Sequence, residues 1–328
     1  MSTAAFALRP PMLPAARRVR AYFAPVLRGA ETPTLFDPAA QPMFPLDSPP
    51  APWIDLGWIE NFKRTSKTEI VPIAGGAKSA AASLARKTMN ARVDFEFREW
   101  GKLQMALSSG SQHMNILATA TGATAAGSGG YEPIAAAITL AGSTSSQIFM
   151  PPLQVMGFAS GDMIAIDIDY TGQTGYVGTG IAGAYVKSAS DVRSDVNYIR
   201  RVTFNVMRLV GTTSSSLLLA NALPGGAPLA NASVQKIVGF VDREGGSFFQ
   251  EWSALFVLPE ENGARVCFHY PRLQPIAPAA ESSFEIAKPI TGFGLHASFT
   301  ALPVIDANDN EQVLCYRSFF PAVNSAMY

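Results

Sequence analysis

The acidic residues between positions 162 and 195 are the first group in this sequence whose types and spacing could do chemistry. A cluster of carboxylates could bind a divalent cation. The spacing does not match an EF-hand loop, however, and the alternation of Met163–Asp169 would project two of the carboxylates from a strand into solvent. We therefore interpret the group as a solvated surface, not a metal site; its members are Asp162, Asp167, Asp169, Asp191 and Asp195.

Two other stretches match chemical motifs only superficially. Gly75-Gly76 with Lys78 and Ser79 is similar to a phosphate loop, but the Gly-x-x-x-x-Gly-Lys-Ser/Thr spacing is absent. Asp242–Gly246 (DREGG) is typical of a charged hairpin turn, because consecutive glycines supply the positive φ of tight turns. An active-site cluster built on its two carboxylates is the alternative.

The histidines and cysteines show no catalytic or metal-binding spacing. His113, His269 and His296 lie far apart in the sequence, and none sits in a metal-ligand pattern. Cys267 and Cys315 have no CxxC spacing, and a cytosolic chain of this size needs no disulfide. We expect two buried free thiols.

A hydrolytic enzyme with a β fold would need a pair of acids in a cleft. The acids that could serve are easily explained as strand or turn surface; they are Glu96, Glu99, Asp242 and Glu251. We therefore predict no catalytic residues, no cofactor and no bound metal, and a protein that is not an enzyme.

Composition narrows the function classes further. The 328 residues are 48% hydrophobic but only 15% charged, and the net charge is zero. A dedicated nucleic-acid binder normally has a basic excess. A surface so poor in charge suits coverage by other subunits, with a Gly/Ala/Ser-rich loop surface as the alternative. The N-terminus fails as a signal peptide and no run of eighteen apolar residues occurs, so we expect no membrane association.

The first 50 residues predict an extended arm. They contain ten prolines and few periodic apolar positions, and such a segment cannot form a core by itself. It nevertheless carries large apolar side chains that could anchor it on a neighbouring subunit, with a simple tail as the alternative. We select Phe23, Phe36 and Phe44 as intersubunit contacts.

Residues 51–133 predict the first part of a β-rich body. Strand patterns cover Trp53–Glu60, Thr68–Ile73 and Ala91–Arg98, the last alternating apolar and charged residues. Ala74–Thr88 is typical of a long Gly/Ala/Ser loop, and Glu99–Leu107 of a short helix.

Two further units follow. Residues 134–232 predict a small inserted β domain, with strands at Met163–Asp169, Asn197–Val210 and Ser215–Ala220. Residues 233–328 predict the second part of the body. Its expected strands are Gln235–Asp242, Ser247–Val257, Ala264–Tyr270, Ser283–Ile286, Leu295–Ala301 and Gln312–Phe320. The predicted fold class is mainly β.

The two body segments resemble the tail tube (major tail) proteins of long-tailed bacteriophages. The resemblance rests on Leu56–Glu60 (LGWIE), on Ala91–Trp100 (ARVDFEFREW), where a strand runs into the short helix, and on the C-terminal stretches Ala264–Leu273 and Gly292–Pro303. It implies a β-sandwich or barrel with a short helix, whose open sheet edges join into hexameric rings. Residues 134–232 would then be a domain inserted into this fold.

The resemblance also implies a role and partners. Stacked rings would form a hollow tube that conducts DNA without specific binding. The chain would contact itself and other tail proteins, and it would be found in the virion and, during assembly, in the host cytoplasm. The loop Ala74–Thr88 and the arm would bridge successive rings, which adds Lys78, Arg86 and Lys87 to the predicted intersubunit contacts. A capsid or tail-decoration protein is the alternative, and a β-fold hydrolase a more distant one.

Overall fold

The structure is a computed structural model that describes residues 18–26, 33–50, 52–74, 81–98, 101–110, 112–118, 137–167, 205–223, 226–243, 251–260, 263–276 and 295–321. These residues are mainly in strands, with two short helices, α1 (Lys102–Ser109) and α2 (Pro152–Val155). The prediction of a mainly β fold is confirmed. Within the described residues, no helix is long and apolar enough to cross a membrane.

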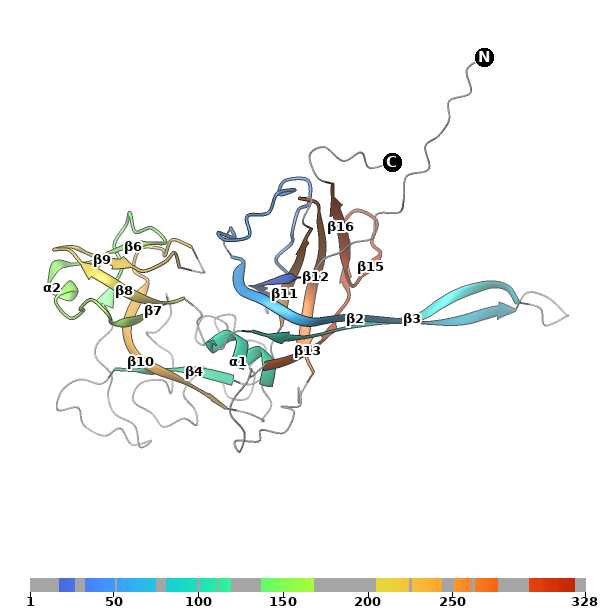
Figure 1. Ribbon diagram of the computed structural model, residues 1–328, viewed down its shortest axis with the longest axis horizontal. Coiled ribbons are helices and arrows are strands. Elements are labelled where there is room, and N and C mark those ends of the chain that lie inside the picture. Colours follow the sequence, from blue (N-terminus) through green and yellow to red (C-terminus); the bar gives the residue numbers. More distant parts are fainter. Residues whose placement is uncertain are drawn as a thin grey trace, which may run out of the picture.

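Six antiparallel strands form a closed barrel (Figure 1). Their order is β11-β1-β2-β3-β13-β12, and the pairing of β11 with β12 closes the sheet on itself. A seventh strand, β16, pairs with the first half of β12. The strands are β1 (Val19–Pro25), β2 (Ile54–Ala74), β3 (Ala81–Phe97), β11 (Trp252–Pro259), β12 (Arg265–Pro275), β13 (Leu295–Ala301) and β16 (Tyr316–Phe320).

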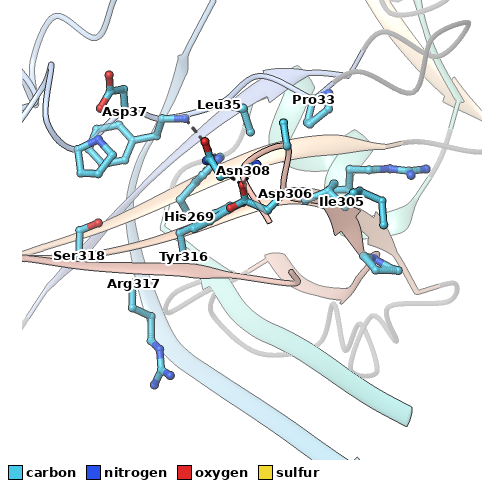
Figure 2. Close-up of a pocket in the computed structure, with 16 residues that line it drawn as sticks. Pro33, Leu35, Asp37, His269, Ile305, Asp306, Asn308, Tyr316, Arg317 and Ser318 are labelled. Carbon is cyan, nitrogen blue, oxygen red and sulfur yellow. Dashed lines mark hydrogen bonds between the residues drawn. The ribbon is translucent and has the colours of Figure 1, made fainter. Parts of the chain in front are cut away.

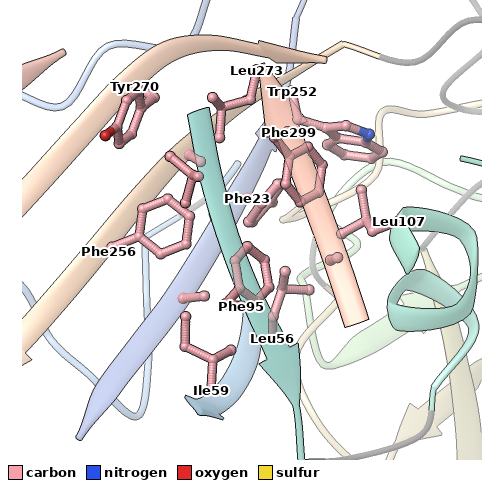
Figure 3. Packing of buried hydrophobic residues seen from close by; sticks show 14 of the residues in the cluster. Phe23, Leu56, Ile59, Phe95, Leu107, Trp252, Phe256, Tyr270, Leu273 and Phe299 are labelled. Carbon is pink, nitrogen blue, oxygen red and sulfur yellow. The ribbon is translucent and has the colours of Figure 1, made fainter. Parts of the chain in front are cut away.

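Aromatic side chains fill the barrel interior (Figure 3). Phe23, Phe95, Phe256 and Phe299 are fully buried, and the rings of Phe95 and Phe299 stack with centroids 5.7 Å apart. They come from four different strands, so the core ties together segments that are far apart in the sequence. On β3 every second residue from Val93 onward is buried, as the alternation of this strand predicted.

Helix α1 packs against the barrel at β13. Leu103 and Leu107 join the aromatic core, and the Ser108 hydroxyl donates a hydrogen bond to the His296 carbonyl at 2.7 Å. The helix ends at Gly110, which adopts the left-handed conformation (φ 61°) that glycine accepts without strain. A helix was predicted at Glu99–Leu107; the observed helix is shifted toward the C-terminus by two to three residues.

The predicted N-terminal arm is largely part of the body, which corrects the boundary at residue 50. β1 lies between β11 and β2, and its consecutive residues Ala21–Ala24 are all buried, so both faces of the strand are covered. The segment 33–50 covers the outer face, where Phe36 and Phe44 pack with Tyr22 and Trp53. This second core layer makes the barrel wall apolar on both sides. Residues 1–17 lie outside the described residues.

Of the predicted loop Ala74–Thr88, Ala74 and residues 81–88 are strand, and residues 75–80 lie outside the described part of the chain. β2 and β3 pair from Ile59↔Phe97 to Ala74↔Ala81, and beyond Ser66↔Ala91 no other described strand flanks them. The result is a two-stranded hairpin that projects from the barrel (Figure 1). Alanine-rich residues 81–85 have low β-propensity, but pairing with a segment of β2 that contains the β-branched Val71 and Ile73 favours the strand.

A second sheet has the order β4-β10-β7-β8-β9-β6, with β5 paired to β10, around its own apolar core (Figure 1). The predicted small β domain is therefore present, but its boundaries at 134 and 232 change, because β4 and β10 belong to this sheet and not to the body. Its strands are β4 (Gln112–Leu117), β5 (Ala137–Ile138), β6 (Gln147–Phe149), β7 (Met163–Asp167), β8 (Val206–Thr212), β9 (Ser216–Leu219) and β10 (Ser233–Arg243).

The end of the chain also differs from expectation. The predicted strand Gln312–Phe320 is divided into β15 (Gln312–Val313), which pairs with β14 (Val304–Ile305), and β16. The predicted strand Ser283–Ile286 lies outside the described residues.

Replacing Phe95 by alanine should lower the free energy of unfolding by about 3–5 kcal/mol, because it empties the centre of the aromatic core. Urea denaturation measures the change. Arg98→Ala is the matched control: Arg98 follows the same strand and forms only an exposed ion pair with Glu60, so its loss should cost no more than about 1 kcal/mol. Equal effects of both substitutions would contradict this description of the core.

Candidate functional site

The root of the β2–β3 hairpin is fixed to the end of the barrel. β2 bends at Asn61, whose φ is 53°, and its pairing with β3 shifts register between Glu60 and Lys63. Asparagine adopts this left-handed conformation more readily than most residues. The bend lays Phe62 against the barrel core, with its ring centroid 4.8 Å from that of Phe256.

Arg64 completes the attachment of the hairpin. Its Nε donates a hydrogen bond to the Tyr270 hydroxyl at 2.6 Å, and its guanidinium lies 4.1 Å from the centroid of the Phe268 ring. Burial raises the pKa of Tyr270 to about 12, so the phenol remains neutral and accepts this bond. The cation–π contact and the charge-assisted hydrogen bond fix the direction in which β2 leaves the barrel, and they also stabilise the strand.

The part of the hairpin beyond this root exposes Lys67 and several apolar side chains. Ile70 is 53% exposed, and Val71 and Met89 are also exposed. Residues 61–92 contain seven basic residues against the single acidic residue Glu69; the basic residues are Lys63, Arg64, Lys67, Lys78, Arg86, Lys87 and Arg92. Because the whole chain is neutral, the remaining residues carry the balancing acidic excess.

A groove of about 930 Å³ lies on the barrel wall between the segment 33–38 and the β14–β15 turn (Figure 2). Its lining is largely apolar, and Leu35 and Ile305 are strongly exposed there. Two carboxylates, Asp37 and Asp306, also line it. Hydrogen bonds from the Asn308 N–H and the Tyr316 hydroxyl hold the pKa of Asp306 below its ordinary value, so it is ionised at neutral pH.

His269 forms the floor of the groove. Its Nδ1–H donates to the Ala254 carbonyl at 3.2 Å, and its Nε2 accepts the Phe36 N–H at 3.3 Å. Because Nε2 accepts this bond, the imidazole is neutral, and burial lowers its pKa to about 4. The ring therefore joins β11 and β12 to the segment that forms one wall of the groove.

The predicted intersubunit contacts divide into two groups. Phe23, Phe36 and Phe44 are buried within the core layers of their own chain, so they are not available to a neighbour and this part of the prediction is corrected. Lys78 lies outside the described residues. Arg86 and Lys87 belong to β3 within the hairpin, although their side chains are outside the described set.

Two of the candidate acids, Asp162 and Glu251, have basic partners among the described residues. Asp162 accepts the Ala159 N–H and forms an ion pair with Lys236 at 2.6 Å. Glu251 pairs with Arg272 at 3.0 Å. No three His, Cys, Asp or Glu side chains in the described part of the chain gather as a metal site would require. Both cysteines are free thiols; Cys267 is buried and Cys315 half-buried.

Sequence reasoning missed the residues that define the hairpin root and the groove. Arg64 and Tyr270 are 206 positions apart, and so no local pattern links them. The one available signal was Asn61, a residue unfavourable in strands that directly follows the predicted strand Trp53–Glu60 and marks the bend. The groove joins three distant segments and left no signal in the sequence.

No protein-family model matches this chain, and no curated protein matches its sequence. The function is therefore inferred from the sequence pattern and from the geometry described above.

Replacing Arg64 by methionine should loosen the hairpin without unfolding the barrel. The substitution keeps an unbranched apolar stem but removes a charge-assisted hydrogen bond, which contributes about 1.5–3 kcal/mol. Amide hydrogen exchange should accelerate in the hairpin beyond Ser66 and stay unchanged in β11. Tyr270→Phe, which removes only the hydroxyl, should have a smaller effect in the same direction. Unaltered exchange in the hairpin would contradict the role of Arg64.

His269 should make the fold sensitive to acid. Its pKa is about 4 in the folded protein against an ordinary 6.5, so unfolding takes up a proton between these pH values. Stability that is fully present above pH 6.5 is lost as the pH falls toward 4, by on the order of 3 kcal/mol. Urea unfolding at neutral pH and near pH 4.5 measures the loss. His269→Gln cannot take up this proton and should flatten that part of the pH profile; an unchanged profile would assign the sensitivity to other groups.

Proposed function

We propose that this protein is a structural protein of a virion that polymerises as stacked hexameric rings into a bacteriophage tail tube, a conduit for DNA. The observation that carries the proposal is the β2–β3 hairpin, which leaves the barrel with its edges and several apolar side chains exposed. Exposed strand edges and apolar side chains are liabilities in a monomer and contact surfaces in an assembly. The resemblance of the body segments to tail tube proteins supplies the kind of assembly.

The closed barrel changes how such subunits would join. Pairing of β11 with β12 leaves the barrel itself without an open edge. Among the described strands of the barrel sheet, the outer edge of β16 and the hairpin edges remain, and Phe319 on β16 is exposed. In this proposal β16 takes the lateral contact within a ring and the hairpin reaches the next ring. Other tail proteins would meet the ends of the tube, in the host cytoplasm and then in the virion.

The length of the hairpin fits the bridging role. Eight residues of β2 extend beyond Ser66, the point at which flanking strands end, and a strand rises about 3.3 Å per residue. The hairpin therefore reaches roughly 25 Å from the barrel. Its anchored root gives that reach a fixed direction, which a repeating contact requires. The second sheet lies outside the barrel, so it leaves the proposed contact surfaces of the barrel free for other subunits.

Electron microscopy and light scattering of the purified chain test the proposal. We expect rings or tubes that grow with protein concentration. Ile70→Glu should abolish them while leaving the fold intact, because the side chain is exposed on the hairpin. Val210→Glu is the matched control: it places the same change at an exposed apolar position of β8, in the second sheet, and should leave assembly intact.

Each other outcome has a definite meaning. A wild-type chain that stays a monodisperse monomer over a wide concentration range overturns the proposal. Closed shells in place of tubes would assign the protein to a capsid. Assembly that Ile70→Glu leaves unchanged would remove the hairpin from the interface.

A further inference from the structure

We infer that the groove beside His269 is the docking site for the basic hairpin of a second copy of this chain. The inference rests on the proposed self-assembly and names the two surfaces that would meet. The groove is defined by the segment 33–38, by residues 303–308 and by β16, and the described part of the hairpin by residues 61–74 and 81–92.

The two surfaces have opposite charge. On β2 the alternation of side chains puts Lys63 and Lys67 on the face opposite the barrel-bound Arg64, and both are exposed. Arg92 lies directly across from Thr65 on that same face, although it already forms an ion pair with Asp94. The same alternation puts Glu69, the single acid of residues 61–92, on this face, and Asp94 lies directly across from Lys63. Three basic residues against two acids leave the face net basic.

The groove and its rim are acidic. Asp37 and Asp306 line it, and the turn between β14 and β15 adds the exposed Asp309 and Glu311. Two arginines also line the groove. Arg272 is neutralised by its bidentate contact with Glu251, with N–O distances of 3.0–3.1 Å. The Arg317 side chain extends away from Asp37 and Asp306 (Figure 2).

Apolar surface matches as well as charge. The lining of the groove includes Leu35, Val304 and Ile305, of which Leu35 and Ile305 are more than half exposed. The hairpin offers Val71 on the same face as Lys63 and Lys67, and Ile70 on the opposite face. A volume of about 930 Å³ accommodates several such side chains at once. A contact with an apolar centre and a charged rim has the anatomy of a protein–protein interface.

A second copy accounts for these features better than nucleic acid does. A basic two-stranded ribbon is also a shape that the major groove of DNA admits. Binding to DNA, however, would not account for the exposed apolar residues of the hairpin, and it would leave the acidic groove unoccupied. The same chain carries both complementary surfaces, so one contact satisfies both.

Charge reversal tests the docking. Lys63→Glu/Lys67→Glu reverses the charge at two positions of the hairpin, and Asp37→Lys/Glu311→Lys reverses the charge at two positions of the groove and its rim. In each variant alone, the critical concentration for assembly should rise at least tenfold, because like charges then face each other. An equimolar mixture of the two variants should restore assembly, since each hairpin again meets a groove of opposite charge. A chain carrying all four substitutions should also assemble. Arg208→Glu, a reversal on the second sheet, is the control and should have no effect.

Circular dichroism confirms that each variant is folded. If the groove variant fails this check, Asp37→Asn/Glu311→Gln replaces it and should weaken assembly less, with stronger loss at high salt. Reversal variants that assemble like the wild type, or a mixture that is not rescued, overturn the docking and leave the proposed assembly standing. A hairpin variant that assembles normally but no longer retains added duplex DNA would make the hairpin a nucleic-acid contact. A wild-type chain that never assembles overturns both proposals.

Discussion

The pairing of β11 with β12 is the contact on which the rest of the structure depends, because it closes six strands into a barrel. Closure forces every second residue of each strand inward, which is where the aromatic cluster around Phe23, Phe95 and Phe256 lies. The outward residues of β1, β11 and β12 are apolar too, and therefore need a cover. The segment 33–50 supplies it through Phe36 and Phe44. Closure thus explains why a proline-rich segment is part of the fold.

Sequence patterns predicted the strands in which apolar and charged residues alternate. They missed the strand residues that are extended only because they pair with a distant segment. The strand at Ala91–Arg98 was correct since one face is apolar and the other charged. Residues 81–87 were assigned to a loop because alanine and serine carry little strand signal, although pairing with β2 extends β3 through them. The partners of Phe36 and Phe44, such as Leu255 and Val257, lie more than 200 residues away. No local window shows that these side chains are core and not anchors for a neighbour.

Sequence patterns indicated the region of the hairpin but neither its structure nor the groove. The region 74–88 attracted attention for its composition, and Arg86 and Lys87 do lie in the projecting hairpin. What gives that hairpin a direction is the bend at Asn61 and the bond from Arg64 to Tyr270, a contact across most of the chain. The groove depends on His269, which joins β11 and β12 to Phe36. The anchored hairpin and the groove both depend on the closed barrel, because closure brings strands that are distant in the sequence together at one end and along one wall.

Charge in this chain is separated and not absent. The net charge of the chain is zero, but residues 61–92 carry a basic excess and the remaining residues an acidic one. Separated charges on one molecule favour association between different patches, because two identical patches repel each other. The proposed contact of hairpin with groove is therefore heterologous: each copy gives one surface and receives another. Such a contact repeats from copy to copy, and the rotation between successive copies decides whether it closes into a ring or continues as a filament.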